Sequence, residues 1–193
     1  MMLMIGDFRN QNIDNTPYSE EQIEFLLKIR NMIDWPWQCF ACDNVSISKE
    51  KSAIGDAYVL KINDLCYMTT FPVDILDHRS IYEIAHGHVL LTGLGLGLGV
   101  LFACHNHKVN SITVVENNSV VLSKIASILV HKCNKSLRFI EHDANTWQPD
   151  MHFNFAYIDH CACDRADSER YIKYSDLVIN WHDERVKLES TWR

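Results

Sequence analysis

Apolar positions near the amino end of the chain follow a helical period. Ser19 stands three residues before Gln22, which is the spacing of a capping box, and apolar residues follow at intervals of three and four. Proline cannot continue a helix, so Pro36 sets the limit at the other end. The pattern therefore predicts a helix over 19–34.

The next patterned stretch has the shorter period of β-strands. Two apolar runs, separated by a turn-favouring Asn-Asp pair, predict a β-hairpin over 58–70. Asp74 is suited to begin a helix that runs to His86, with Gly87 in the helix-ending position. The extension formed by residues 1–72 is thus expected to hold one helix and one hairpin.

From His88 onward, short apolar runs alternate with amphipathic segments. This alternation is typical of right-handed βαβ units and a parallel sheet. It predicts an α/β fold with a Rossmann-like, doubly wound, mostly parallel sheet over 73–193. The expected strands are 89–91, 112–115, 137–140 and 153–158, and the expected helices are 100–107 and 119–132.

A glycine run follows the first of these strands, in the segment V-L-L-T-G-L-G-L-G-L-G. A strand that turns tightly into a helix needs backbone freedom, and a ligand that lies against the main chain needs Cβ atoms to be absent. Gly93, Gly95 and Gly97 fit both requirements, which makes them candidate ligand-binding residues. The alternative is a turn whose glycines serve packing alone.

Acidic residues end the following strands. Glu116 comes 23 positions after Gly93, where a carboxylate can accept hydrogen bonds from both ribose hydroxyls, and Asn117 follows it. Asp143, with Ala144 beside it, is a candidate for the adenine edge, and Asp159 is a candidate for the reactive end of a ligand. Each has a plainer alternative, as a solvated strand end, a turn aspartate or a helix cap.

The glycine spacing bears on the class of ligand. The dinucleotide fingerprint G-x-G-x-x-G places its third glycine where this chain has Leu98 or, in the second register, Val100. The dinucleotide pattern therefore fails in both registers. The spacing favours a ligand with a single nucleoside.

Composition narrows the classes of partner. A formal net charge of −7 without a cluster of lysine and arginine argues against nucleic acid as the partner. No apolar run is long enough to span a bilayer, and the amino end does not resemble a signal peptide. Seven scattered cysteines argue against a secreted disulfide framework, so a reduced, cytoplasmic protein is expected.

With these residues in view, the segment 88–159 resembles the first four strands of class I S-adenosylmethionine-dependent methyltransferases. The glycine run together with I-T-V-V-E-N is most similar to the spermidine-synthase-like branch. A wider likeness over 68–193, including M-T-T-F-P-V-D-I-L-D-H-R and H-D-A-N-T-W-Q-P, resembles small bacteriophage methyltransferase-like proteins, which would place this chain in the host cytoplasm.

The resemblance implies S-adenosylmethionine as the cofactor. It places the three glycines around the methionine and ribose parts, Glu116 on the ribose, Asp143 and Ala144 at the adenine, and Asp159 as the catalytic residue beside a small-molecule acceptor such as an amine. It also suggests that the hairpin matches the small β element that precedes the aminopropyltransferase core.

The chain also departs from the family. Only 34 residues follow Asp159, so the sheet is expected to be truncated at its carboxyl-terminal end, with 176–181 as one more strand or part of a helical tail. His160-Cys161 replaces the proline-proline-aromatic motif of amino-methylating DNA enzymes. Three functions stay open: a small-molecule methyltransferase, a non-catalytic binding or interaction module, and a spermidine-synthase-like aminopropyltransferase. A homo-oligomer in which a second subunit completes the sheet is a further alternative.

A zinc site is a separate hypothesis. Cys39 and Cys42 have the spacing of half a zinc site, and Cys161 and Cys163 are candidates for the other half. The one-residue gap in the second pair is tight. Buried or incidental thiols are the favoured interpretation, and no metal is predicted.

Overall fold

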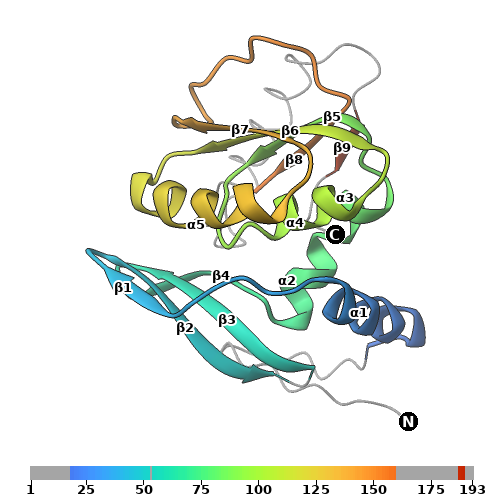
Figure 1. Ribbon diagram of the computed structural model, residues 1–193, viewed down its shortest axis with the longest axis vertical. Helices are drawn as coiled ribbons and strands as arrows, with labels where there is room; N and C mark the ends of the chain where they lie inside the picture. Colours follow the sequence, from blue (N-terminus) through green and yellow to red (C-terminus); the bar gives the residue numbers. More distant parts are fainter. Residues whose placement is uncertain (1–17, 53, 160–186, 190–193) are drawn as a thin grey trace. The chain divides into compact units, whose positions relative to one another are not determined.

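The computed structural model describes residues 18–52, 54–159 and 187–189. The chain divides between Leu76 and Asp77 into two compact units, the N-terminal unit and the C-terminal unit. The sequence patterns placed this boundary at 72/73. Each unit has a sheet of its own (Figure 1).

The N-terminal unit begins with helix α1 (Glu20–Met32), as the sequence predicted. The capping box is present: the Ser19 hydroxyl accepts a hydrogen bond from the Gln22 backbone N–H at 3.2 Å, and the Gln22 side chain accepts one from the Ser19 N–H at 2.8 Å. These two bonds satisfy donors that an uncapped helix leaves without partners. The helix buries Phe25, Leu26 and Ile29.

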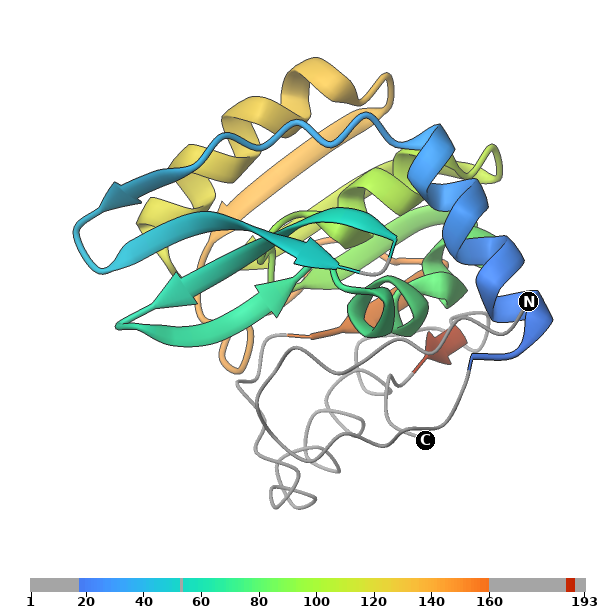
Figure 2. The ribbon, with the colours of Figure 1, turned by 90° about the horizontal axis from the view of Figure 1, so that it is seen from below.

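Four antiparallel strands complete this unit and form a twisted sheet (Figure 2) in the order β1-β2-β3-β4. The strands are β1 (Phe40–Cys42), β2 (Val45–Ser52), β3 (Gly55–Ile62) and β4 (Leu65–Thr69). The predicted hairpin is confirmed as β3 and β4. Asn63 and Asp64 have φ of 51° and 63°, the left-handed conformation that a two-residue hairpin turn requires. Strands β1 and β2 were not predicted, because β1 has only three residues and the second half of β2 is polar.

The single helix predicted over 74–86 is wrong, because the chain forms two short helices, α2 (Pro72–Asp77) and α3 (Arg79–Glu83). In a continuous helix the Asp77 carbonyl would accept from the Ile81 N–H. It accepts instead from the Tyr157 hydroxyl at 3.0 Å, and the Ile81 N–H donates to the His78 carbonyl. Gly87 lies in the next strand with φ of 62°, and does not end a helix.

The C-terminal unit holds a parallel sheet with the order β7-β6-β5-β8-β9, which confirms the predicted α/β fold. The strand order reverses at β5, so the sheet is doubly wound, with its switch point between β5 and β8. The strands are β5 (Gly87–Thr92), β6 (Val109–Glu116), β7 (Ser136–Glu141), β8 (Phe155–Ile158) and β9 (Lys187–Glu189). The predicted segment 176–181 lies outside the described residues.

Helices α4 (Leu98–His105) and α5 (Ser119–Lys132) contact β5, β6 and β7 and lie on one face of the sheet (Figure 1). The other face is covered by the irregular segment 142–154, whose Trp147 and Phe153 pack against buried residues of the strands. Within the described ranges, none of the helices combines the length and the apolar character that a bilayer crossing requires.

A disulfide joins Cys104, in the last turn of α4, to Cys133, which caps the end of α5. The two Cα atoms lie 5.5 Å apart, within the range that a disulfide needs. This pair departs from the expectation that the cysteines are reduced. The reason is tertiary: adjacent helices on one face of the sheet bring two residues together that are 29 positions apart in sequence.

Candidate functional site

The glycine run forms the turn between β5 and α4. Gly93, Gly95 and Gly97 all have positive φ, at 85°, 50° and 78°, a conformation that side chains with a Cβ rarely adopt. Two hydrogen bonds hold the turn, from the Gly93 N–H to the Val115 carbonyl at 2.8 Å and from the Gly97 N–H to the Leu94 carbonyl at 2.7 Å. The predicted tight turn is therefore present.

The glycines differ in what surrounds them. A Cβ on Gly97 would lie 2.6 Å from Leu129 Cδ1 of α5, so a side chain there would force Leu129 to shift. A Cβ on Gly99 would lie 3.2 Å from both Leu91 and Ile81, a tighter contact than most side chains make. Gly93 and Gly95 are partly exposed. The packing alternative therefore accounts for the second half of the run, and Gly93 and Gly95 are the stronger candidates for contact with a ligand.

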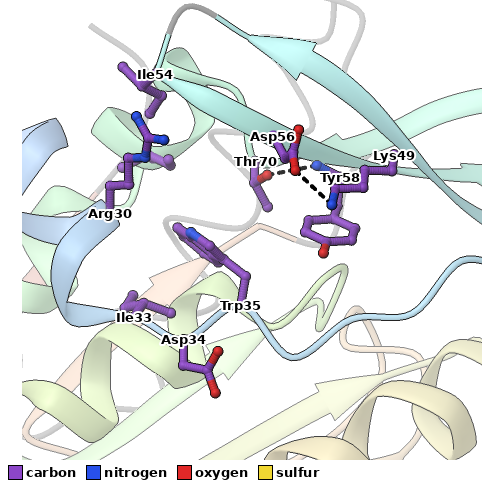
Figure 3. A pocket seen from close by; sticks show the side chains of 10 residues that line it. Arg30, Ile33, Asp34, Trp35, Lys49, Ile54, Asp56, Tyr58 and Thr70 are labelled. Carbon is purple, nitrogen blue, oxygen red and sulfur yellow. Dashed lines mark hydrogen bonds and ion pairs between the residues drawn. The ribbon is translucent and has the colours of Figure 1, made fainter.

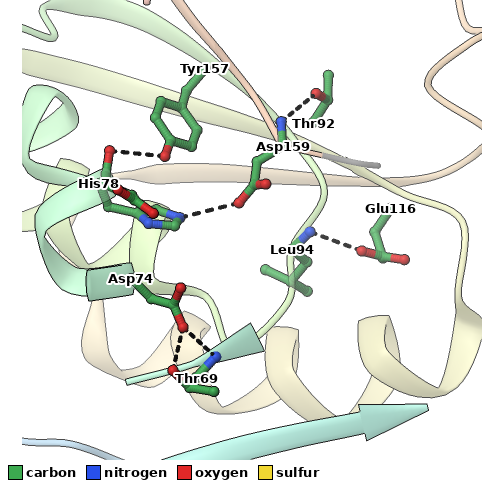
Figure 4. A network of polar contacts seen from close by, with 9 residues as sticks. Thr69, Asp74, His78, Thr92, Leu94, Glu116, Tyr157 and Asp159 are labelled. Atoms are coloured by element: carbon green, nitrogen blue, oxygen red, sulfur yellow. Dashed lines mark hydrogen bonds and ion pairs between the residues drawn. The ribbon is translucent and has the colours of Figure 1, made fainter. Parts of the chain in front are cut away.

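Glu116, the last residue of β6, is bound to the glycine loop (Figure 4). One carboxylate oxygen accepts the Leu94 N–H at 2.8 Å, and the other accepts the Asn118 N–H at 2.7 Å. The residue is only 9% exposed, so these bonds form in a largely desolvated place, where an unpaired donor would be costly. The carboxylate thus fixes the loop to the end of the neighbouring strand.

Asn117 and Asn118, after Glu116, have different surroundings. Asn117 is exposed. Asn118 caps α5, because its side-chain oxygen accepts the N–H groups of Val120 and Val121 at 3.0 Å each. Of these two asparagines, the predicted binding residue Asn117 is therefore the one whose side chain is exposed to solvent.

Asp143 and Ala144 follow β7. The His142 N–H donates to the Glu116 carbonyl at 3.0 Å, which ties this segment to the end of β6. The Asp143 carboxylate is exposed and accepts both the backbone and the side-chain N–H of Asn145, at 2.9 and 2.6 Å, so it organises its own turn. Ala144 is buried with the apolar cluster that contains Trp147.

Asp159 follows β8, and its N–H donates to the Thr92 carbonyl at 2.9 Å. One carboxylate oxygen lies 3.4 Å from Nε2 of His78 (Figure 4). The Asp159 side chain is 39% exposed and that of His78 only 7%, so the pair has one buried and one open member. The His78 ring packs against Tyr157, with the centroids 4.9 Å apart.

His78 is a residue that the sequence patterns did not single out. It lies between α2 and α3, where the predicted continuous helix would have placed it on a helix surface. The bond from the Tyr157 hydroxyl to the Asp77 carbonyl breaks that helix, and the break sets the imidazole beside Asp159. The position of His78 thus depends on a contact between residues 80 positions apart, and no local sequence pattern predicts such a contact.

The strand register brings the predicted residues to one edge of the sheet. Thr92 pairs with Val115 on one side and with Ile158 on the other, so β5, β6 and β8 end at the same level. The glycine loop, Glu116 and Asp159 therefore meet at the carboxyl edge, beside the switch point. The edge carries two carboxylates and partly exposed backbone, an arrangement suited to a polar ligand with hydroxyl or amine donors.

The structure describes two of the four cysteines in the zinc hypothesis. Cys39 is exposed, and Cys42 is half-buried at the end of β1. Cys161 and Cys163 lie outside the described residues. Within the part of the chain that the structure describes, no group of three or more histidine, cysteine or acidic side chains is arranged to hold a metal ion.

Neither a protein-family model nor a curated protein sequence matches this chain. Parts of it are similar to solved structures. An S-adenosylmethionine-dependent methyltransferase from Clostridium acetobutylicum aligns at 17% identity over 60% of this chain and 47% of its own, with a TM-score of 0.45. Spermidine synthase from Thermotoga maritima aligns at 12% identity over 64% and 47%, with a TM-score of 0.45.

A dimethyladenosine transferase from Plasmodium falciparum aligns at 14% identity over 53% of this chain and 36% of its own, with a TM-score of 0.41. The chain thus spans less than half the length of each of these three proteins.

Proposed function

We propose that the C-terminal unit binds S-adenosylmethionine at the carboxyl edge of its sheet and transfers the methyl group to a small acceptor. The observation that carries this proposal is the bond between Glu116 and the glycine loop. It places a carboxylate, with lone pairs that no described residue uses, next to partly exposed backbone at the switch point of a doubly wound sheet. The resemblance of the glycine run to methyltransferases supports the same ligand.

The residues fit an adenosyl ligand. A carboxylate has about four acceptor positions, and described residues use two of those on Glu116, which leaves acceptors for the ribose hydroxyls. Gly93 and Gly95 would lie along the methionine and ribose parts. The loop after β7, with Asp143 and Ala144, and the exposed Asn117 would lie toward the adenine.

When bound, S-adenosylmethionine supplies a methyl group that its positively charged sulfur activates. The protein's task is then to align the acceptor and to exclude competing water. Asp159 is suited to orient an amine acceptor and to take its proton. His78 would act as a positioning residue, because its buried imidazole holds one Asp159 oxygen and leaves the other for the acceptor.

Binding is the first test of the proposal. In isothermal titration calorimetry the full chain should bind S-adenosylmethionine and S-adenosylhomocysteine, and NAD⁺ should not compete. Incubation with S-adenosylmethionine and a panel of small amines should then yield S-adenosylhomocysteine, detected by mass spectrometry. Absence of binding would overturn the proposal. Binding without turnover on any acceptor would favour the non-catalytic module.

Removal of the Asp159 charge is expected to separate chemistry from binding. Asp159→Asn should lower turnover by about 100-fold or more, the usual range for loss of a group that handles a proton. The affinity for S-adenosylmethionine should stay within about twofold, because the side chain lies toward the acceptor. Glu141→Gln, at an exposed carboxylate ending β7, is the matched control and should change neither quantity. Equal turnover in Asp159→Asn and wild type would remove Asp159 from the mechanism.

Aminopropyl transfer is the second candidate. It is supported by the antiparallel sheet that precedes the parallel one along the chain, the element that the resemblance to spermidine synthases associates with that reaction. The two reactions use cosubstrates that differ by a carboxylate. Tighter binding of decarboxylated S-adenosylmethionine in a thermal-shift comparison would favour aminopropyl transfer over methyl transfer.

A further inference from the structure

The N-terminal unit contains a cavity of about 310 Å³ between the end of α1 and strands β2 and β3 (Figure 3). This volume is near the lower end of the range for small-molecule sites. Its lining comprises cations, carboxylates, aromatic rings, a threonine and a few aliphatic groups. The residues that matter for its chemistry are Arg30, Trp35, Lys49, Asp56 and Tyr58.

Arg30 supplies a cation that lies against main chain. Its guanidinium covers Gly55, the first residue of β3, so closely that a Cβ there would lie 2.5 Å from Nη2. Gly55 also has φ of 120°, which disfavours a side chain. No described residue forms an ion pair or hydrogen bond with this guanidinium. The exposed guanidinium therefore offers a planar donor array to a carboxylate.

Aromatic rings form the wall next to Arg30. Trp35 stacks on the buried Trp37, with the centroids 5.3 Å apart and the planes at 25°, and Tyr58 contacts the same ring at 5.4 Å. Figure 3 shows the Trp35 indole between Arg30 and Tyr58. Because Trp37 supports both rings from behind, the wall is held in place before a ligand arrives, which lowers the entropy cost of binding.

The charged side chains that line the cavity are two cations and two carboxylates, so the lining carries no net charge. Lys49 lies 2.6 Å from an Asp56 oxygen, and Lys51 pairs with the other oxygen. Hydrogen bonds from these two lysines lower the pKa of Asp56 to about 2, so its single negative charge meets two positive ones at neutral pH. Lys49 also lies 5.9 Å from the centre of the Tyr58 ring. The other lining carboxylate, Asp34, points away from these groups in Figure 3.

We infer that this cavity binds a small aromatic carboxylate. The carboxylate would take the Arg30 guanidinium in a two-point contact, and the ring would lie against Trp35 and Tyr58. Neither feature alone specifies this class, since a cation would accept any anion and an aromatic wall any flat apolar molecule. Together they select molecules that carry both parts.

The test uses the full chain and three related probes in titration calorimetry. The probe 2-naphthoate has a ring and a charge, 2-naphthamide lacks the charge, and cyclohexanecarboxylate lacks the aromatic ring. Wild type should bind 2-naphthoate about tenfold or more tightly than either of the others. Equal affinity for 2-naphthoate and 2-naphthamide would overturn the inference.

Variants locate the binding. Arg30→Gln and Trp35→Leu should each weaken 2-naphthoate binding by about tenfold or more, and Arg30→Lys should recover only part of the loss. Lys28→Gln, which removes a cation from the same helix outside the cavity, is the control and should bind as wild type. Wild-type affinity in an Arg30→Gln variant with an unchanged melting temperature would also overturn the inference.

A competition experiment keeps this site distinct from the proposed function. Saturating S-adenosylmethionine should not displace 2-naphthoate, and Arg30→Gln should leave S-adenosylmethionine binding unchanged. Displacement would place the probe in the cofactor site and overturn the cavity assignment. Failure of the proposed cofactor binding would leave the probe experiment intact, because the two sites share no residue.

Discussion

Glu116→Ala should lower the affinity for S-adenosylmethionine by about 30-fold or more, which corresponds to about 2 kcal/mol. Two losses add in this variant. The ribose hydroxyls lose their acceptor, and the Leu94 and Asn118 N–H groups lose the partner that holds the glycine loop. The affinity of Glu116→Gln should lie between those of wild type and Glu116→Ala. Its amide oxygen can accept from one of the two N–H groups, while its NH₂ group faces the other.

Glu141 provides a matched control for this experiment. It pairs in register with Glu116 on the adjacent strand and ends at the same edge, but its side chain is exposed. Glu141→Ala removes the same charge at the same level of the sheet and should leave the affinity within about twofold. Titration calorimetry measures both variants, and circular dichroism shows whether each is folded. A folded Glu116→Ala variant with wild-type affinity would contradict the site assignment.

Gly97→Ala should lower the free energy of unfolding by about 2–4 kcal/mol. Its φ of 78° contributes backbone strain, and the new Cβ would lie 2.6 Å from Leu129 Cδ1. Neither the glycine loop nor α5 can move away easily, because Glu116 holds the first and Asn118 caps the second.

Urea denaturation followed by circular dichroism measures this change. Ser123→Ala, at an exposed position of α5, is the control and should change stability by less than about 0.5 kcal/mol. A double-mutant cycle with Leu129→Ala separates the two causes, since the cost of Gly97→Ala should shrink when the facing side chain is shortened. A cost below about 1 kcal/mol in the wild-type background would contradict the packing argument.

Local signals in the sequence predicted the elements whose ends are set locally. The capping box at Ser19 located α1, and an amphipathic stripe located α5. The Asn-Asp turn located the hairpin of β3 and β4. In each case the hydrogen bonds that define the element join residues close in sequence, so the pattern contains the information.

Local sequence patterns did not predict the elements that depend on contacts between distant residues. The second half of β2 is polar, and it is a strand because β3 pairs with it. The helix expected over 74–86 breaks because Tyr157, far along the chain, takes the Asp77 carbonyl. The sheet order also required the structure, although the alternation of strands and helices predicted that the sheet would be parallel.

The candidate site likewise combines features that the sequence predicted with features that only the structure shows. Strand ends and glycines were recognised in the sequence, and the register brings Glu116 and Asp159 to one edge as expected for parallel strands. The role of Glu116 as a partner of the loop, and the place of His78 beside Asp159, follow from side chains that meet only in the folded chain. The closeness of Leu129 to the Gly97 backbone belongs to the same group.

The irregular crossover between β7 and β8 affects how this fold can vary. A helical crossover must change length by whole turns to keep its apolar stripe on the sheet, whereas segment 142–154 covers the sheet through a few anchors such as Trp147 and Phe153. Chain can therefore be added or removed between those anchors one residue at a time. This flank is where insertions should be tolerated best, and where a fused peptide or a new loop could be introduced without changing the strand pairing.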